Sequence, residues 1–196
     1  MTRDAAKHGM PPVGARDARL LILGSLPGDK SIRQQQYYAH PQNQFWRILS
    51  EIFDAPFPAD YRECLALLDQ HGIAVWDVLR HAHRPGSLDA AIKAPVVNDF
   101  AVFFAQRPHI AAIAFNGQKA AALFKTCVTD ADVITRAAEM RKVTLPSTSP
   151  AAAMLRLDEK IKKWRAFLTA SDAGDLSPAV LKAPPAARRA GSTGRR

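Results

Sequence analysis

Short, continuous apolar runs recur along the chain and predict buried strands. The first covers residues 20–23 and ends at Gly24, a pattern typical of a strand that is covered on both faces in a parallel sheet. The second and third cover residues 73–76 and 110–115. Weaker strand signals come from Val133 and from residues 143–145.

Between these runs, apolar residues recur at helical spacing or follow helix-start residues. They predict helices over residues 43–54, 60–70 and 118–126, a helix that Asn98 or Asp99 begins and Gln106 ends, and a last helix from Ser149 and Pro150 to about residue 169. Alternating strands and helices predict an α/β fold, in three α/β/α layers around a small, mainly parallel sheet.

The ends of the chain differ from its middle in composition. Residues 1–18 are mixed and carry two prolines, so we expect a flexible leader. Residues 171–196 are rich in Ala, Pro, Gly and Arg and predict a disordered basic tail. One domain over residues 19–170 remains between them.

Charge favours a polyanionic partner such as nucleic acid. The net charge is +9, and residues 171–196 hold five basic and two acidic groups, so both the body and the tail are basic. A net positive charge also aids solubility, so the charge alone does not distinguish a nucleic-acid-binding protein from a merely soluble one. No apolar run is long enough for a membrane helix, and we expect a soluble, cytoplasmic monomer, associated with the nucleoid in a prokaryote.

Cysteine and histidine positions argue against a metal or other cofactor. Cys64 and Cys127 lack the spacing of a four-thiolate zinc or iron–sulfur site. His81 and His83 have no carboxylate or cysteine nearby at ligand spacing. We therefore expect neither a metal nor a cofactor.

Four polar segments follow the predicted strands, and they place a candidate site. They are residues 25–42, 77–94, 116–117 and 146–150. Because ligands of α/β sheets bind beyond the carboxyl ends of the strands, these loops predict an active site at one edge of the sheet.

The first two segments carry candidate base-binding groups. Gly24 and Ser25 form a small-residue turn that lets backbone N–H groups approach a flat base, although such turns are common in α/β proteins. Tyr38, His40 and Phe45 offer stacking faces and polar edges for an extruded base. Phe45 is equally compatible with a core position in the following helix.

The remaining candidates lie near the ends of other strands. Asn116 offers a donor and an acceptor to a base edge, or simply forms an Asn-Gly turn. Asp77 suits orientation of water or of a base edge, and equally a loop cap. The hydroxyls that suit a DNA phosphate are Ser147, Thr148 and Ser149.

Together these segments resemble the hypoxanthine-DNA glycosylases, the deoxyinosine-removing branch of the uracil-DNA glycosylase superfamily. The resemblance covers residues 19–168 and is carried by residues 21–28, 37–46, 75–79, 114–117 and 145–151. The string Tyr-Tyr-Ala-His-Pro-Gln-Asn-Gln-Phe-Trp at 37–46 is its most specific element. Most superfamily members place a catalytic Asp or Asn where this chain has Leu26.

The resemblance implies a function and assigns roles. In the hypoxanthine branch the later asparagine is catalytic, which is Asn43 here, and Asn116 becomes a second functional amide. It implies a monofunctional enzyme that flips a deaminated base out of DNA and hydrolyses its N-glycosidic bond, with hypoxanthine as the first candidate. The alternatives are a uracil or mismatch glycosylase, a non-catalytic DNA-binding domain of the same fold, and, least favoured by the charge, a nucleotide hydrolase.

Overall fold

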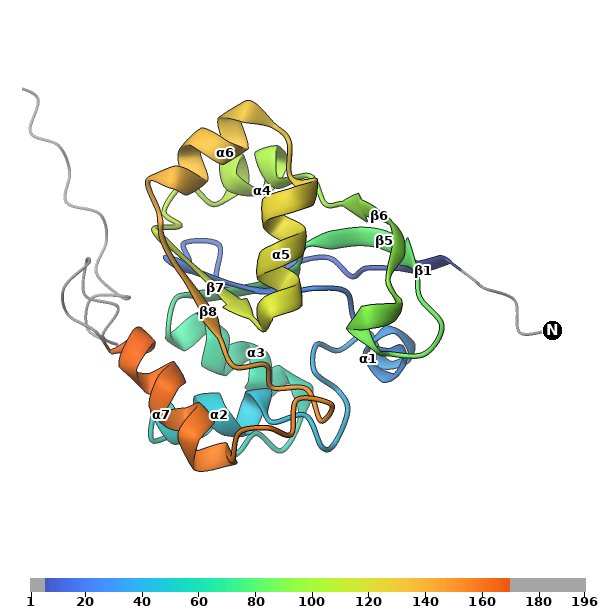
Figure 1. Ribbon diagram of the computed structural model, residues 1–196. Coiled ribbons are helices and arrows are strands. Elements are labelled where there is room, and N and C mark those ends of the chain that lie inside the picture. Colours follow the sequence, from blue (N-terminus) through green and yellow to red (C-terminus); the bar gives the residue numbers. More distant parts are fainter. Residues whose placement is uncertain (1–5, 170–196) are drawn as a thin grey trace, which may run out of the picture.

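Five strands form the central sheet of the computed structural model, which describes residues 6–169 (Figure 1). They are β2 (Val13–Gly14), β3 (Leu20–Gly24), β4 (Ile73–Asp77), β7 (Ala112–Asn116) and β8 (Arg141–Leu145), in the order β2-β4-β3-β7-β8. β3 runs parallel to β4 and β7, and β7 runs parallel to β8. β2 is an antiparallel edge strand. The predicted small, mainly parallel sheet is confirmed.

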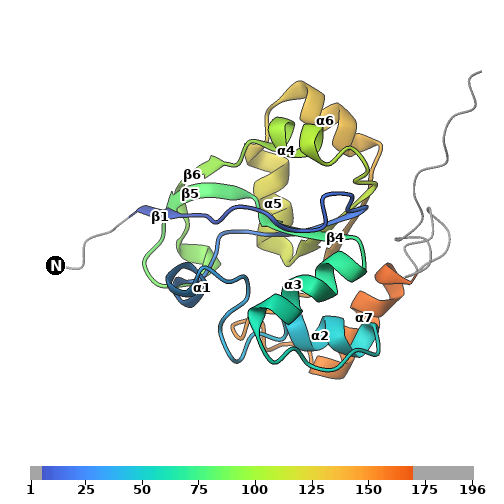
Figure 2. The same cartoon turned by 180° about the vertical axis from the view of Figure 1, so that it is seen from behind.

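Helices cover both faces of this sheet (Figures 1 and 2). One layer holds α2 (Phe45–Ile52), α3 (Tyr61–Gln70) and α7 (Leu157–Leu168), and the other holds α4 (Phe100–Gln106), α5 (Gln118–Cys127) and α6 (Ala131–Ala138). The predicted three-layer α/β/α class is therefore confirmed.

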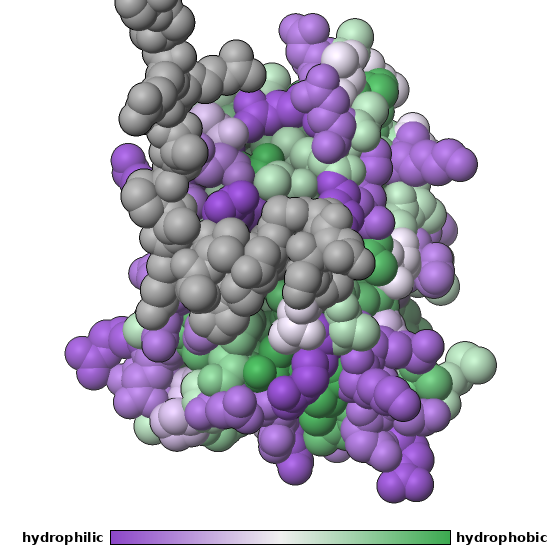
Figure 3. Space-filling view, turned by 90° about the vertical axis from the view of Figure 1, so that its left-hand side faces the viewer, coloured by the Kyte–Doolittle hydropathy of each residue, from purple (hydrophilic) through white to green (hydrophobic). Residues whose placement is uncertain are grey.

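The core explains why the strand signals were so clear. Residues 20–23 of β3 have no exposed surface, because helices pack on both sides of the strand. Burying each such side chain contributes roughly 1.5–3 kcal/mol. The helices present their polar sides outward. On the face seen in Figure 3, hydrophilic side chains form most of the visible periphery and hydrophobic groups gather toward its centre.

A second, three-stranded antiparallel sheet lies beside the first and was not predicted. It consists of β1 (Ala6–His8), β5 (Leu79–His83) and β6 (Lys93–Val97), in the order β1-β5-β6. Residues 6–18 are thus not a flexible leader, and 77–94 is not a continuous polar loop. These strands are short and keep polar side chains half-exposed, so their hydrophobic periodicity is weak. The predicted tail, 171–196, lies outside the described residues.

Three local predictions also need correction. The polar segment 25–42 contains a short helix, α1 (Asp29–Gln34). Val133 belongs to α6, because the Asp130 side chain caps that helix by accepting from the Val133 N–H at 2.9 Å. The last helix begins at Leu157, where the Glu159 carboxylate accepts from the Arg156 N–H at 2.9 Å.

Candidate active site

A cleft of about 490 Å³ opens beyond the carboxyl ends of β3, β4, β7 and β8, the edge at which the sequence placed the site. This volume falls within the range of pockets that hold small ligands. Of the residues that the sequence singled out, those lining the cleft are Gly24, Ser25, Tyr38, His40, Asn43, Asp77, Asn116, Ser147, Thr148 and Ser149.

The floor of the cleft brings Asp77, Gly24 and Tyr38 together. Asp77 ends β4, and its side chain is buried, with 4% of the residue exposed. A Cβ atom on Gly24 would overlap the Asp77 Oδ1 atom and would lie 3.5 Å from the Tyr38 Oη. Burial raises the pKa of Asp77 to about 7, Arg84 opposes this shift, and Asp89 adds to it.

The glycine at position 24 is therefore required by packing. We expect Gly24→Ala to lower the free energy of unfolding by about 1–3 kcal/mol, because the new methyl group must push the Asp77 carboxyl aside. Chemical denaturation followed by circular dichroism measures this loss. Gly28→Ala is the matched control, since its Cβ would stand 3.4 Å from the Ser87 Oγ, an ordinary contact. Equal stability of the two variants would contradict the prediction.

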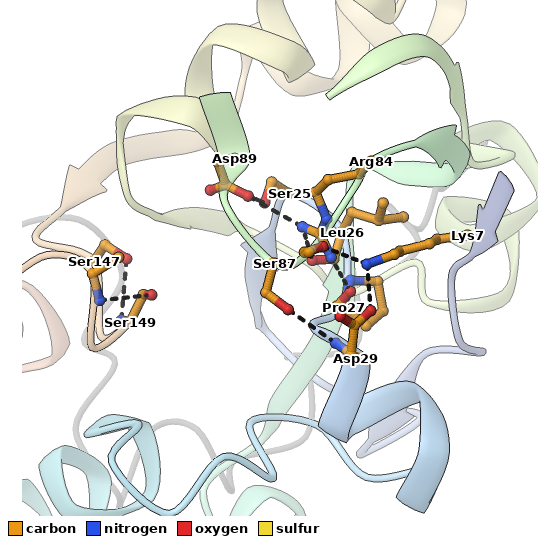
Figure 4. Close-up of polar contacts among 12 residues, drawn as sticks. Lys7, Ser25, Leu26, Pro27, Asp29, Arg84, Ser87, Asp89, Ser147 and Ser149 are labelled. Atoms are coloured by element: carbon orange, nitrogen blue, oxygen red, sulfur yellow. Dashed lines mark hydrogen bonds and ion pairs between the residues drawn. The ribbon is translucent and has the colours of Figure 1, made fainter. Parts of the chain in front are cut away.

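Arg84 fixes the turn that follows β3, in a network that the sequence did not reveal (Figure 4). Its guanidinium is almost fully buried. Nη1 donates to the Leu26 carbonyl at 3.1 Å, Nη2 donates to the Pro27 carbonyl, and Nη1 lies 3.4 Å from Asp89 Oδ1. The Ser25 hydroxyl donates to the same Asp89 oxygen at 2.7 Å. Burial lowers the pKa of Arg84, and the nearby carboxylates oppose that shift.

The same turn is also tied to the N-terminal strand and to the hairpin loop between β5 and β6. Lys7 of β1 forms an ion pair with Asp29 and donates to the Gly86 carbonyl. The Asp29 N–H donates to the Ser87 hydroxyl at 3.2 Å. The second sheet thus holds one wall of the cleft in place.

The sequence did not predict how the aromatic rings of Tyr38 and Phe45 are arranged beside the cleft. The Tyr38 ring stacks on Phe45, with ring centroids 3.9 Å apart, and Phe45 is fully buried beneath it. Phe45 therefore does not line the cleft, because α2 turns it into the core against Trp164. Tyr38 adopts left-handed backbone angles, with φ at 56°. Burial and the charge of Asp77 raise the pKa of its hydroxyl.

Asn116 joins two loops through both ends of its amide. Its Nδ2 donates to the Thr148 hydroxyl at 2.9 Å, and its Oδ1 accepts from the Thr148 N–H at 2.9 Å. Each amide end retains further hydrogen-bonding capacity for a ligand. Thr148 is fully buried, so its side chain serves this link rather than the surface.

Ser147 and Ser149 lie half-buried in the loop after β8 (Figure 4). The Ser147 hydroxyl accepts from the Ser149 N–H at 3.2 Å, and the Ser149 hydroxyl accepts from the Ala151 N–H at 3.3 Å. Both hydroxyl protons remain available to donate to an anion. The two serines therefore suit a phosphate better than Thr148 does.

Asn43 lines the cleft just before α2, but the N-cap of this helix is Gln44 and not, as the sequence had suggested, Asn43. Its Oδ1 accepts from the Phe45 N–H at 3.0 Å, and its own N–H donates to the His40 carbonyl at 2.8 Å. His40 is exposed at the rim, where its Nδ1 accepts from the Gln42 N–H at 3.2 Å. The bond from the Phe45 N–H orients the Asn43 amide, and this is compatible with a role in the site.

The geometry agrees with what comparison with known proteins shows. A model of the Uracil DNA glycosylase superfamily matches residues 11–169. The chain belongs to this superfamily. Two superfamily relatives from Methanosarcina barkeri and Methanosarcina acetivorans are named hypoxanthine DNA glycosylase. They are 41% and 40% identical over 114 and 115 residues, which is 58% of this chain and 72% and 73% of theirs.

A solved structure of the superfamily shares the fold. It is a solution NMR structure of a protein from Methanosarcina acetivorans that carries the provisional name uracil DNA glycosylase. The TM-score is 0.69 at 33% identity, over 83% of this chain and 96% of that one. The resemblance to the superfamily and its fold is therefore confirmed.

Leu26 lines the cleft at the position where the sequence resemblance implied a catalytic Asp or Asn in most of the superfamily. This side chain is 5% exposed and apolar, and its carbonyl accepts from Arg84. An aliphatic group neither activates water nor stabilises a cation, so those tasks fall to other residues of the cleft. Within residues 6–169, no cluster of three His, Cys, Asp or Glu side chains is arranged to hold a metal, and no helix is long and apolar enough to cross a bilayer.

Proposed function

We propose that this protein is a DNA glycosylase that hydrolyses the N-glycosidic bond of hypoxanthine in DNA. The observation that carries the proposal is that Asn43, Asn116 and the loop with Ser147 and Ser149 line one cleft, at the carboxyl ends of the parallel strands. The relatives named hypoxanthine DNA glycosylase support the choice of base. The net charge of +9 supports DNA as the partner.

Each residue group of the cleft has a separate role in the proposed reaction. Ser147 and Ser149 bind a phosphate, and the damaged nucleotide flips into the cleft, which costs least at a mispair. Tyr38 stacks on the base, and Asn116 hydrogen-bonds its edge. Asn43 positions the attacking water and stabilises the positive charge that develops on the deoxyribose.

The proposed chemistry is slow and monofunctional. An amide is not an effective base at neutral pH, so Asn43 orients water without deprotonating it. Lys119 lines the cleft, but simple hydrolysis needs no lysine adduct, and we expect no strand nicking. We further propose that the protein acts as a monomer, with the chromosome in the cytoplasm.

A cleavage assay tests the function. Labelled duplexes that each hold one hypoxanthine, uracil or xanthine are incubated with the enzyme and then treated with alkali. We expect cutting at hypoxanthine, and we expect Asn43→Ala to lower its rate at least tenfold, because the water loses its orienting amide. Gln34→Ala is the matched control, since Gln34 is an exposed amide at the end of α1.

The other outcomes distinguish the alternatives. Faster cutting at uracil would assign the uracil or mismatch activity, which the name of the solved relative favours. Salt-sensitive binding with no alkali-labile product from any duplex would identify a non-catalytic DNA-binding domain, which Leu26 favours. Cutting at hypoxanthine that Asn43→Ala leaves unchanged would refute the role of Asn43 alone.

A further inference from the structure

Asp77 places a carboxyl group at the bottom of the cleft with one oxygen unsatisfied. Its Oδ2 atom is buried and has no hydrogen-bond partner among the described residues. Its Oδ1 atom lies against the backbone of Gly24. Buried polar atoms are almost always hydrogen-bonded, so an orphan oxygen at the floor of a cleft points to a ligand that is bound there.

Burial, with a smaller contribution from Asp89, favours the neutral form of Asp77, and Arg84 favours the charged form. Tyr37 and Tyr38 face it from the segment before α2, Arg84 from the end of β5, and Asp89 from the short 3-10 helix Asp89–Ala91. Arg84 hydrogen-bonds the carbonyls of Leu26 and Pro27 and pairs with Asp89. Burial therefore dominates, and it brings the pKa of Asp77 to about 7.

The chemistry of the proposed reaction calls for such a group. A purine leaves its sugar as an anion unless a proton reaches one of its ring nitrogens. Leu26 cannot assist the sugar cation, and the amides of Asn43 and Asn116 do not release protons at neutral pH. The hydroxyls of Tyr37 and Tyr38 also keep their protons at neutral pH, because burial raises the pKa of each further above its ordinary value.

We propose that Asp77 is the general acid of this enzyme and delivers its carboxyl proton to the departing purine. The inference rests on the proposed function. As the C1′–N9 bond breaks, its electron pair passes to the purine and the Asp77 proton bonds to N7 or N3. Water then bonds to C1′, and the proton that it loses returns to the Asp77 carboxylate. The products are free hypoxanthine and an abasic site.

Single-turnover rates across pH test this assignment. For the full chain on the hypoxanthine duplex, we expect a constant rate below about pH 7 and an approximately tenfold fall for each unit above it. Asp77→Asn is isosteric but holds no acidic proton. We expect it to cut at least tenfold more slowly at about pH 6 and to lose this fall. Asp69→Asn is the matched control, because Asp69 is an exposed aspartate of α3 whose pKa burial also raises.

Modified bases separate proton transfer from a purely structural effect. Duplexes with 7-deazahypoxanthine or 3-deazahypoxanthine each lack one candidate proton acceptor. We expect the wild type to cut one of them slowly, and Asp77→Asn to cut that same duplex at the wild-type rate. If Asp77→Asn slows both analogues and hypoxanthine equally, the general-acid role is overturned.

Two further results are decisive in different ways. If Asp77→Asn cuts hypoxanthine with the rate and pH profile of the wild type, this inference is overturned, but the proposed glycosylase function is not. A wild-type protein that cuts none of the duplexes overturns the proposed function, and this inference falls with it.

Discussion

Replacing Arg84 with glutamine is expected to lower the free energy of unfolding by about 3–5 kcal/mol. The guanidinium is 1% exposed and donates to the carbonyls of Leu26 and Pro27 while it faces Asp89. A glutamine side chain is too short to serve these partners together. Carbonyl groups inside the protein would lose their donors, and Asp89 would lose its counter-charge. Urea denaturation monitored by circular dichroism measures the change.

An exposed arginine of the same chain supplies the control. Arg62 pairs with Asp60 at 3.0 Å, but its side chain is 92% exposed. Because surface ion pairs contribute little, Arg62→Gln should change the unfolding free energy by less than about 1 kcal/mol. Arg84→Lys should fall between the two, since it keeps the charge without the forked geometry. If Arg84→Gln were as stable as Arg62→Gln, the turn after β3 would not depend on this network.

The central sheet was predictable because its strands are covered on both sides. Because β3 is fully buried, residues 20–23 are all apolar, and a run this short is typical of a strand and too short for a buried helix. β5 lacks this signal, because Leu79 and Ala82 are buried while Arg80 is exposed and the two histidines are half-buried. Its pairing with β1 and β6 depends on partners distant in sequence, which local pattern does not encode.

The position of the site at one edge of the sheet was predictable from the sequence, but the packing of its side chains was not. Asp77 and Asn116 end parallel strands, so topology alone brings them to one edge of the sheet. The order of Tyr38 over Phe45 was not predictable, since it depends on the rotation of α2 and on the left-handed backbone at Tyr38. Arg84 was missed because it follows an unpredicted strand, and an arginine in a polar segment is ordinarily exposed.

Asp77 should make the protein less stable as the pH rises. Its pKa is about 7 in the folded protein, against an ordinary value of 3.8. Between these values the folded state keeps a proton that the unfolded state has lost, so the contribution of Asp77 to stability is highest below about pH 4 and falls until about pH 7. At 1.36 kcal/mol per unit, the fall attributable to Asp77 is about 4 kcal/mol. Asparagine carries no such proton.

Comparison of the two proteins across pH isolates this contribution. The unfolding free energy of Asp77→Asn relative to wild type should rise between about pH 4 and 7 and then stay constant. Asp69→Asn should show a much smaller change, because Asp69 is exposed and water screens its charge. A difference between Asp77→Asn and wild type that stays constant across this range would mean that Asp77 ionises as freely in the folded protein as in the unfolded chain. An aspartate of that kind would already have lost its proton at neutral pH. It would then have none to give to a departing base, so the stability curve and the cleavage profile test the same protonation state by independent means.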